Sequence, residues 1–320
     1  MSYQKVLVIL GPTATGKTDL ALILANKFNG ELVSCDSRQI YRGLDIGTGK
    51  YPNSKLQITK SKGFWEIEGI RVWMYDVISP KKQYTVADYV KNADRVIRDI
   101  GKRGKLPIVV GGSGLYLKAL LEGLPNLAIP IDRNLRKELE ILTLEQLQMR
   151  LKKLSPERWN LLNDSDRQNK RRLVRHIELV LSKANQGNRG DQGKELEFDI
   201  LKIGLTATRE IIYKKADKRV IERINQGMVE ESQNLHQVGL SYKRMKQLGL
   251  EYGVLADYLQ GKIKSKEELI EIMQNKIHGY IRRQLTWFKR EKDISFFDIT
   301  KRGFGGNVEK KVAKWYHYLK

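Results

Sequence analysis

Residues 11–18 read GPTATGKT and fit the pattern G-x-x-x-x-G-K-[ST] of a phosphate-binding loop. An apolar stretch at residues 5–10 precedes the loop, and Leu20, Leu24 and Phe28 follow it at a spacing of four. The segment therefore predicts a strand, the loop and a helix over residues 19–28. A glycine turn with an exposed lysine is the alternative, but it would not need a strand before it and a helix after it. Since the N–H groups of such a loop wrap a phosphate at the start of a helix, the segment indicates an α/β fold.

The same alternation continues along the chain. Strands are expected at residues 31–35, 73–77 and 106–110, and helices at residues 87–100 and 115–121. The run at residues 106–110 is apolar without a break, which is typical of a strand in a parallel sheet that is covered on both faces. The expected fold class is therefore α/β, a P-loop NTPase-like parallel sheet flanked by helices.

A helical insertion is expected to interrupt this core. Residues 133–181 follow a helical pattern, residues 185–193 form a polar, glycine-rich loop, and residues 198–205 read as a strand again. From residue 209 onward the chain is expected to be mostly helical. We thus expect a core made of residues 1–122 and 194–320, and a helical insertion domain made of residues 123–193.

The charge balance suggests a kind of partner. The chain has 59 Lys and Arg against 37 Asp and Glu, a formal net charge of +22. Such an excess indicates either a polyanionic partner such as nucleic acid or an otherwise ordinary basic enzyme. No apolar run reaches the roughly 18 residues of a membrane span, and the single cysteine, Cys35, excludes an internal disulfide. We therefore expect a cytoplasmic protein that does not bind membranes.

Chemistry is expected at the carboxyl edge of the sheet. Asp36 closes the strand at residues 31–35 and should lie on the same edge as the loop. It could be a Mg²⁺ ligand, a general base or a residue that only caps a turn. In the loop, Lys17 supplies charge and Thr18 can ligate Mg²⁺. The glycine-rich turn at residues 111–114 contains Ser113 and ends another strand on this edge.

Two basic segments could contact nucleic acid. In KRRLVRHIELVL, residues 170–181, helical spacing places Arg171, Arg172 and Arg175 on the face opposite the apolar residues. They could grip phosphates or form an ordinary solvated face. In YIRRQLTWFKREK, residues 280–292, aromatic and basic residues are interleaved. We expect Trp287 and Phe288 to be core residues there, while the basic residues remain candidate contacts to nucleic acid: Arg282, Arg283, Lys289 and Arg290.

Taken together, these motifs resemble one family, the bacterial tRNA dimethylallyltransferases. GPTATGKT, LVSCDSRQIYRGLDIGTGK and LPIVVGGSGLYLKALLEGL occur in the family's order and spacing. RRLVRHIELV, TREIIYKKADKRVIERINQGM, LGLEY and RRQLTWFKR continue the match over nearly the whole chain. The resemblance implies transfer of a dimethylallyl group from dimethylallyl diphosphate to the exocyclic N6 of the adenosine 3′-adjacent to the anticodon in tRNAs, with release of diphosphate. It also implies that the loop binds the diphosphate of this donor and not ATP.

The resemblance assigns roles to particular residues. Asp36 takes the proton of the attacking amine, Thr13, Lys17 and Arg219 hold the diphosphate, and Thr18 is placed for Mg²⁺. The whole loop lines the diphosphate: Gly11, Pro12, Thr13, Ala14, Thr15, Gly16, Lys17 and Thr18. The positions expected to contact tRNA are Asp36, Ser37, Arg38, Gln39, Ser113, Arg136, Arg171, Arg172 and Arg175. The expected partners are the anticodon stem-loop of tRNA and dimethylallyl diphosphate, bound by a monomer.

The chain departs from the family's pattern at three places. Ser113 stands where a threonine is usual and keeps the hydroxyl. Ile277 and His278 replace a Thr-Arg pair. Around residues 56–70 the chain is longer, and GFWEIEG is expected to form an extra hairpin on the loop after the DSRQIYRG block.

Two other classes of function compete with this one. A P-loop small-molecule kinase would explain the core but not the basic insertion. An RNA-binding P-loop module would explain the charge but would leave Asp36 without a role.

Overall fold

The structure is a computed structural model that describes residues 3–50, 56–127, 129–186 and 198–318. Its contacts divide the chain into two compact units, one formed by Met1–Leu121 with Leu196–Lys320 and the other by Glu122–Glu195. Each unit is described by itself. Residues 187–193 of the expected boundary loop lie outside the described residues, and residues 185–186 are the end of a helix.

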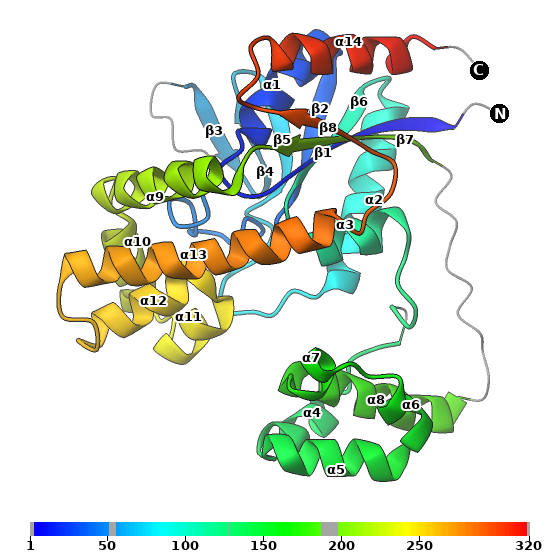
Figure 1. Cartoon of the computed structure of the whole chain (residues 1–320), viewed down its shortest axis with the longest axis vertical. Helices are drawn as coiled ribbons and strands as arrows, with labels where there is room; N and C mark the ends of the chain where they lie inside the picture. Colours follow the sequence, from blue (N-terminus) through cyan, green and yellow to red (C-terminus); the bar gives the residue numbers. More distant parts are fainter. Residues whose placement is uncertain (1–2, 51–55, 128, 187–197, 319–320) are drawn as a thin grey trace. The chain divides into compact units, whose positions relative to one another are not determined.

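The first unit contains an eight-stranded sheet in the order β3-β4-β5-β2-β6-β1-β7-β8 (Figure 1). Its strands are β1 Gln4–Leu10, β2 Gly30–Cys35, β3 Ile58–Ser61, β4 Gly63–Ile67, β5 Ile70–Tyr75, β6 Leu106–Gly111, β7 Phe198–Thr206 and β8 Ile294–Asp298. The strands from β5 to β8 in this order pair in parallel, and β3 and β4 add an antiparallel edge. The expected α/β fold class, a largely parallel sheet flanked by helices, is confirmed.

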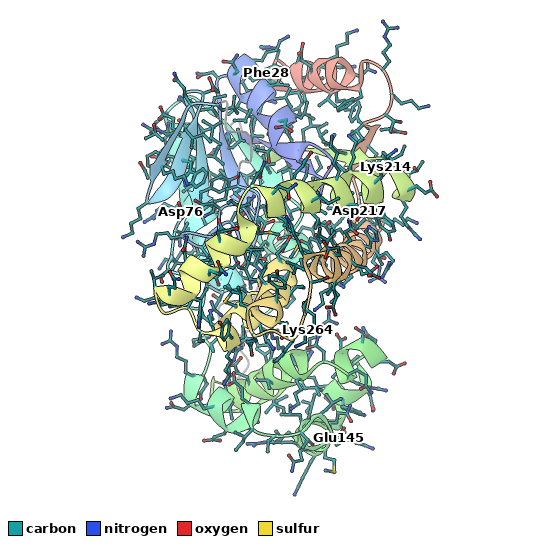
Figure 2. The ribbon with its side chains drawn as sticks, turned by 90° about the vertical axis from the view of Figure 1, so that its left-hand side faces the viewer. Phe28, Asp76, Glu145, Lys214, Asp217 and Lys264 are labelled. Carbon is teal, nitrogen blue, oxygen red and sulfur yellow. The ribbon has the colours of Figure 1, made fainter. Side chains whose placement is uncertain are left out.

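Both faces of the sheet are covered by helices, which explains the apolar runs in its central strands. On β1, Leu7 and Ile9 belong to the cluster with the helices α1 (Lys17–Lys27) and α14 (Phe304–Tyr316). Val6 and Val8 belong to the cluster on the other face, with α2 (Val86–Lys102) and α3 (Gly114–Leu121). Successive side chains of a strand point to opposite faces, so a continuous apolar run serves both layers. Figure 2 shows Phe28 beside α14, and its ring centroid lies 5.6 Å from that of Tyr316 on this helix.

A third, all-helical layer completes the first unit. It consists of α9 (Arg209–Asn225), α10 (Met228–Gln237), α11 (Tyr242–Leu248), α12 (Leu250–Leu259) and α13 (Lys266–Phe288). Their apolar faces share one core with the segment that follows β2, through Ile40, Tyr41 and Leu44. This packing fixes that segment, and therefore fixes the residues next to Asp36.

The second unit is a small helical domain. Its helices are α4 (Arg133–Glu140), α5 (Leu144–Leu154), α6 (Pro156–Asn160), α7 (Asp164–Arg167) and α8 (Lys170–Gln186). Leu139, Leu147, Leu151, Leu173 and Ile177 form the centre of its core and are fully buried. Among the described residues of both units, no helix combines the length and the apolar character needed to cross a bilayer.

Two expectations about the later and the inserted segments are confirmed, each with one addition. The chain after residue 209 is mostly helical, but residues 294–298 also form β8, which pairs in parallel with β7. β8 is a short edge strand whose hydrogen bonds come from a segment about ninety residues earlier, a contact that local pattern does not reveal. The extra hairpin is present as β3 and β4, and it joins the main sheet through β5.

Candidate functional site

Three chain segments end at one edge of the sheet because their strands are in register. Leu10 of β1 and Cys35 of β2 both pair with Gly111 of β6. The residues that follow these strands therefore lie side by side. The backbone N–H of Ser37 donates to Ser113 Oγ at 3.2 Å, and Ser113 N–H donates to the carbonyl of Cys35 at 3.4 Å. The hydroxyl at position 113 thus joins the segment after β2 to the turn after β6.

The loop after β1 has the backbone of a phosphate-binding loop. Gly16 caps α1 in the left-handed region with φ of 77°, which glycine adopts without strain. A Cβ on Gly11 would lie 2.5 Å from the carbonyl oxygen of Leu205, so this position has room only for glycine. Because α1 begins at Lys17, its first N–H groups lack helical acceptors and are available to an anion.

Two half-buried cations face this loop. Lys17 Nζ donates to the carbonyl of Pro12 at 2.7 Å, and Arg219 of α9 donates to Thr13 Oγ1. Burial, and then the charge of Arg219, lower the pKa of Lys17 to about 7, although Asp36 opposes this shift. Burial, and then the charge of Arg223, lower the pKa of Arg219 to about 9. The negative charge of a polyanion bound here would offset the repulsion between these two cations. It would also compensate for the solvation that each of them lacks in this site.

Asp36 is held in a fixed orientation at the end of β2. Its Oδ1 accepts the backbone N–H of Arg38 at 2.8 Å, a local turn that Asp favours. The residue is half-buried and lines the same cavity as Lys17 and Arg219. A carboxylate that faces a cationic site across a cavity can accept a proton or help to hold a cation.

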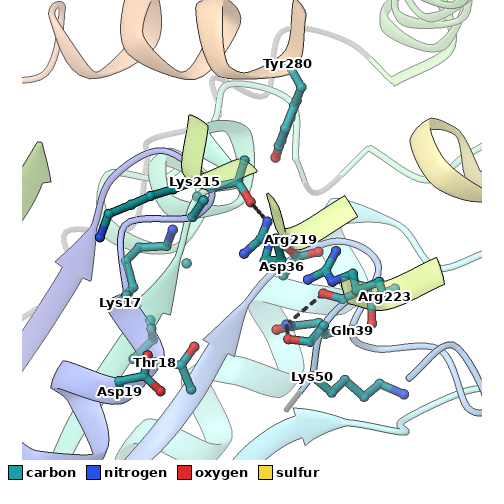
Figure 3. A pocket seen from close by; sticks show the side chains of 18 of the residues that line it. Lys17, Thr18, Asp19, Asp36, Gln39, Lys50, Lys215, Arg219, Arg223 and Tyr280 are labelled. Atoms are coloured by element: carbon teal, nitrogen blue, oxygen red, sulfur yellow. Dashed lines mark hydrogen bonds between the residues drawn. The ribbon is translucent and has the colours of Figure 1, made fainter. Parts of the chain in front are cut away.

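The cavity has a volume of about 530 Å³ (Figure 3). Of the residues predicted from the sequence, it brings together Thr13, Ala14, Gly16, Lys17, Thr18, Asp36, Gln39 and Arg219. A smaller cavity of about 120 Å³ shares Thr13, Asp36 and Arg219 with it and adds Ser37 and Arg38. A third, of about 290 Å³, is lined by Ser37 and Ser113. Asp36 therefore lines the largest of these cavities and the smallest, and Ser37, the next residue, also lines the one that contains Ser113.

Gln284 of α13 is a site residue that the sequence reasoning missed. Its Oε1 accepts the backbone N–H of Thr13 at 3.0 Å, and its Nε2 donates to the carbonyl of Gly112 at 2.9 Å. It is buried and thus joins the phosphate loop to the turn after β6. Gln284 is the one glutamine of RRQLTWF, residues 282–288, and the only sign of its role in the sequence is an uncharged polar side chain within a basic and aromatic motif.

Other lining residues were also missed. Arg223, Tyr280 and Glu251 line the 120 Å³ cavity, and Arg223 and Tyr280 also line the larger one. Gln39, expected to contact tRNA, accepts a hydrogen bond from Ser34 Oγ at 2.7 Å. Its amide donates to the carbonyls of Thr48 and Gly49, so in the structure it supports the wall of the cavity.

The arginines of the second unit are not equivalent. Arg136 and Arg175 both pair with the buried carboxylate of Glu178, at 2.9 and 2.6 Å. Arg175 also donates to the backbone carbonyls of Asn126 and Ile129. Arg171 and Arg172 are exposed, and Arg172 pairs with Asp166. Two of the four predicted tRNA contacts therefore also hold this unit together.

The basic side chains at the end of α13 and directly after it are exposed: Arg282, Arg283, Lys289 and Arg290. Phe288 is buried, whereas Trp287 is half-buried and lines the 290 Å³ cavity. At the unusual pair, Ile277 is buried, and His278 stacks on Tyr213 at 3.9 Å between ring centroids. His278 also shares a hydrogen bond of 2.7 Å with Asp217.

The residues present suit a Mg²⁺ ion only if a ligand contributes to its coordination. Among the described residues, no group of three or more His, Cys, Asp or Glu side chains could hold a metal. Thr18 and Asp36 line the cavity and offer oxygen ligands. Mg²⁺ is commonly held by one or two protein oxygens together with phosphate oxygens and water, and this donor set fits that pattern.

Two protein-family models and several known proteins match this chain. The family model described as IPP transferase matches residues 39–291, and that described as isopentenyl transferase matches residues 4–69. The tRNA dimethylallyltransferase of Pelotomaculum thermopropionicum is 38% identical over 301 residues, which cover 92% of this chain and 91% of that protein. The tRNA dimethylallyltransferase 2 of Treponema denticola is 38% identical over 285 residues, 88% of this chain and 91% of that protein.

Two solved structures are similar over almost the whole chain. The tRNA isopentenylpyrophosphate transferase of Bacillus halodurans superposes with a TM-score of 0.67 at 29% identity, covering 98% of both chains. A eukaryotic dimethylallyltransferase acting on tRNA superposes with a TM-score of 0.77 at 25% identity, covering 97% of this chain and 78% of the other. Since a family model spans most of the chain and curated relatives match it over nearly its full length, this chain belongs to the IPP transferase family, the family of the tRNA dimethylallyltransferases.

Proposed function

We propose that the protein transfers a dimethylallyl group from dimethylallyl diphosphate to N6 of the adenosine 3′-adjacent to the anticodon in tRNAs. The observation that carries the proposal is the single cavity lined by Asp36 and by Thr13, Lys17 and Arg219. It combines a base with a cationic cradle, which transfer of an allyl group from a diphosphate to an amine requires.

In the proposed reaction the exocyclic N6 attacks C1 of the allyl group, and an N6–C1 bond forms as the C1–O bond breaks. The electron pair of the broken bond leaves with the diphosphate, and the proton of N6 passes to Asp36. Lys17, Arg219 and the loop N–H groups stabilise the charge that develops on the leaving group. A bound Mg²⁺, with Thr18 as a ligand, would supply further charge neutralisation.

The proposed nucleic-acid partner is the anticodon stem-loop, bound by a monomeric enzyme in the cytoplasm. The target base must leave its stack to reach Asp36, which suits an unpaired loop better than a duplex. The segment from Ser37 to Gln39 and the hydroxyl of Ser113 border the cavities next to Asp36. In the second unit, Arg136, Arg171, Arg172 and Arg175 are proposed to face phosphates, with Arg171 and Arg172 the most available.

One incubation separates this proposal from its competitors. The full chain is mixed with unmodified tRNA, Mg²⁺ and either dimethylallyl diphosphate or ATP, and the digested nucleosides and nucleotides are analysed by mass spectrometry. We expect prenylated adenosine with the first donor and no ADP with the second. ADP formation would indicate the kinase function, and RNA binding without either product would indicate the binding module.

The exposed arginines of α8 give a prediction about tRNA binding. Changing Arg171 and Arg172 together to glutamate should weaken binding of the stem-loop and lower the slope of log K against log salt by about 2, since each phosphate contact contributes about one. Donor binding should not change. Binding is measured by fluorescence anisotropy over a salt series.

A matched pair tests whether position matters as well as charge. Lys310 and Lys311 are exposed neighbours on α14, and their change to glutamate gives the same difference in net charge. We expect a much smaller effect from that pair. Equal effects of the two pairs would contradict a specific phosphate grip on α8. Arg175 is left unchanged because it pairs with the buried Glu178, and its loss would destabilise the second unit itself.

A further inference from the structure

Arg223 of α9 is a buried guanidinium whose hydrogen-bonding capacity is only partly used. Its side chain is 6% exposed, and Nη1 donates to the carbonyl of Gly47 at 3.1 Å. The nearest carboxylate, Glu251, lies 3.7 Å from Nη1, and Nε has no acceptor among the described residues. Leaving a buried charged donor without a partner is unfavourable, so its position calls for a further ligand.

The wall of the cavity is shaped to admit this side chain. Gly49 has φ of 58°, and a Cβ on it would lie 1.7 Å from Nη2 of Arg223. The guanidinium thus occupies the space that any other residue at position 49 would fill. The lining of the 530 Å³ cavity includes Gly49 and Arg223 as well as Lys17 and Arg219.

The site holds more positive than negative charge. Arg219 and Arg223 are four residues apart on one helix and face the same cavity, as Figure 3 shows. The lining of this cavity contains six Lys and Arg side chains, among them Lys17, against three Asp and Glu side chains, and Glu251 lines the adjoining cavity. The lowered pKa of Arg219, caused first by burial and next by the charge of Arg223, agrees with this excess of positive charge.

We propose that Arg223, oriented by Glu251, is a further binding residue for the donor's diphosphate, in addition to the phosphate loop, Lys17 and Arg219. This inference rests on the proposed function, because it assigns the missing negative charge to the diphosphate of that reaction. The carboxylate of Glu251 offsets part of the positive charge of Arg223 before an anion binds. When the diphosphate binds, its oxygens accept hydrogen bonds from the unused N–H groups of Arg223.

A diphosphate fits the observations better than a phosphate of the RNA backbone. RNA phosphates are gripped by side chains that reach the protein surface, whereas Arg223 is buried and lies one helical turn beyond Arg219. A diphosphate is small enough to enter the cavity, and its several oxygens can accept from more than one guanidinium.

The test compares binding of inorganic pyrophosphate with Mg²⁺ and binding of an anticodon stem-loop RNA, both by calorimetry on the full chain. Arg223→Met combined with Glu251→Gln removes the pair without leaving one charge buried alone. We expect pyrophosphate affinity to fall by about 10- to 100-fold, the effect of one lost charge-assisted hydrogen bond, and RNA affinity to stay within a few-fold. Arg223→Lys keeps the charge but loses the planar fork, and should give a smaller loss.

The control applies the same two substitutions to an ion pair at the other edge of the sheet. Glu31 and Arg103 pair at 2.6 Å near the start of β2, and Arg103→Met with Glu31→Gln should leave pyrophosphate affinity unchanged. If circular dichroism shows that the Arg223 double variant does not fold, the pyrophosphate affinity of Arg223→Lys tests the inference in its place.

Unchanged pyrophosphate affinity in folded variants would overturn the inference, and so would a loss confined to RNA binding. Failure of the unmodified protein to bind pyrophosphate would instead overturn the proposed function, and this inference with it.

Discussion

Replacing Asp36 with asparagine is expected to lower the single-turnover rate of prenyl transfer by about 10²- to 10⁴-fold, the usual contribution of one general base. Asparagine has nearly the same size as aspartate and its side-chain oxygen can still accept the N–H of Arg38. What it cannot do is accept the proton of N6. Affinities for the stem-loop and for the donor should therefore stay within a few-fold. The measurement is a rapid-quench time course at saturating enzyme.

The same variant separates a base from a metal ligand. If Asp36 mainly held Mg²⁺, Asp36→Asn would weaken donor binding, and extra Mg²⁺ would restore part of the activity. A Mg²⁺ titration of rate and donor affinity gives the answer. Rescue by Mg²⁺ would contradict the general-base role, and turnover close to that of the unmodified protein would contradict both roles.

Replacing Lys17 with alanine is expected to raise the KM for the donor and to lower turnover by about 10²- to 10³-fold, as loss of one donor to a developing oxyanion commonly does. Lys17 stands at the start of α1 and contacts the loop that is proposed to bind the leaving group. The decisive measurement is the steady-state rate with dimethylallyl diphosphate, run beside an assay for ADP with ATP present. ATP should be neither hydrolysed nor needed.

Lys17 also gives the donor site a pH dependence whose sign is fixed. In the free protein its pKa is about 7, because burial and then Arg219 disfavour the charged form. A bound diphosphate favours that form and raises the pKa, so binding takes up a proton above pH 7. Affinity for pyrophosphate should therefore fall about tenfold per pH unit between about pH 7 and 8.5, in addition to the titration of pyrophosphate itself.

Lys17→Arg serves as the control for this effect. Arginine stays charged at these pH values. The pyrophosphate affinity of the Lys17→Arg variant should therefore fall less steeply with pH than that of the unmodified protein, even if this affinity is lower at every pH. Calorimetry in buffers of different ionisation enthalpy counts the protons taken up. Identical slopes for lysine and arginine at position 17 would show that another group controls the titration.

The sequence alone determined the features that depend on neighbouring residues. The apolar run before GPTATGKT and the spacing of Leu20, Leu24 and Phe28 predicted β1, the loop and α1. Asp36 was placed at the edge of the sheet that carries the loop because it directly follows an apolar strand, and strands that run parallel end at a common edge. The structure confirms these positions, because hydrophobic periodicity and glycine conformation are local properties.

What the tertiary structure decided depends on partners far away in the chain. Gln284 reaches Thr13 across 271 residues, and Arg223 meets Glu251 only because α9 and α12 pack in one core. In the second unit, helical spacing places Arg171 and Arg175 on one face, yet only Arg175 pairs with the buried Glu178. Periodicity tells which face of a helix a side chain occupies. The packing of distant elements decides which partner the side chain meets on that face, and therefore whether its charge stabilises the fold or remains available to a ligand.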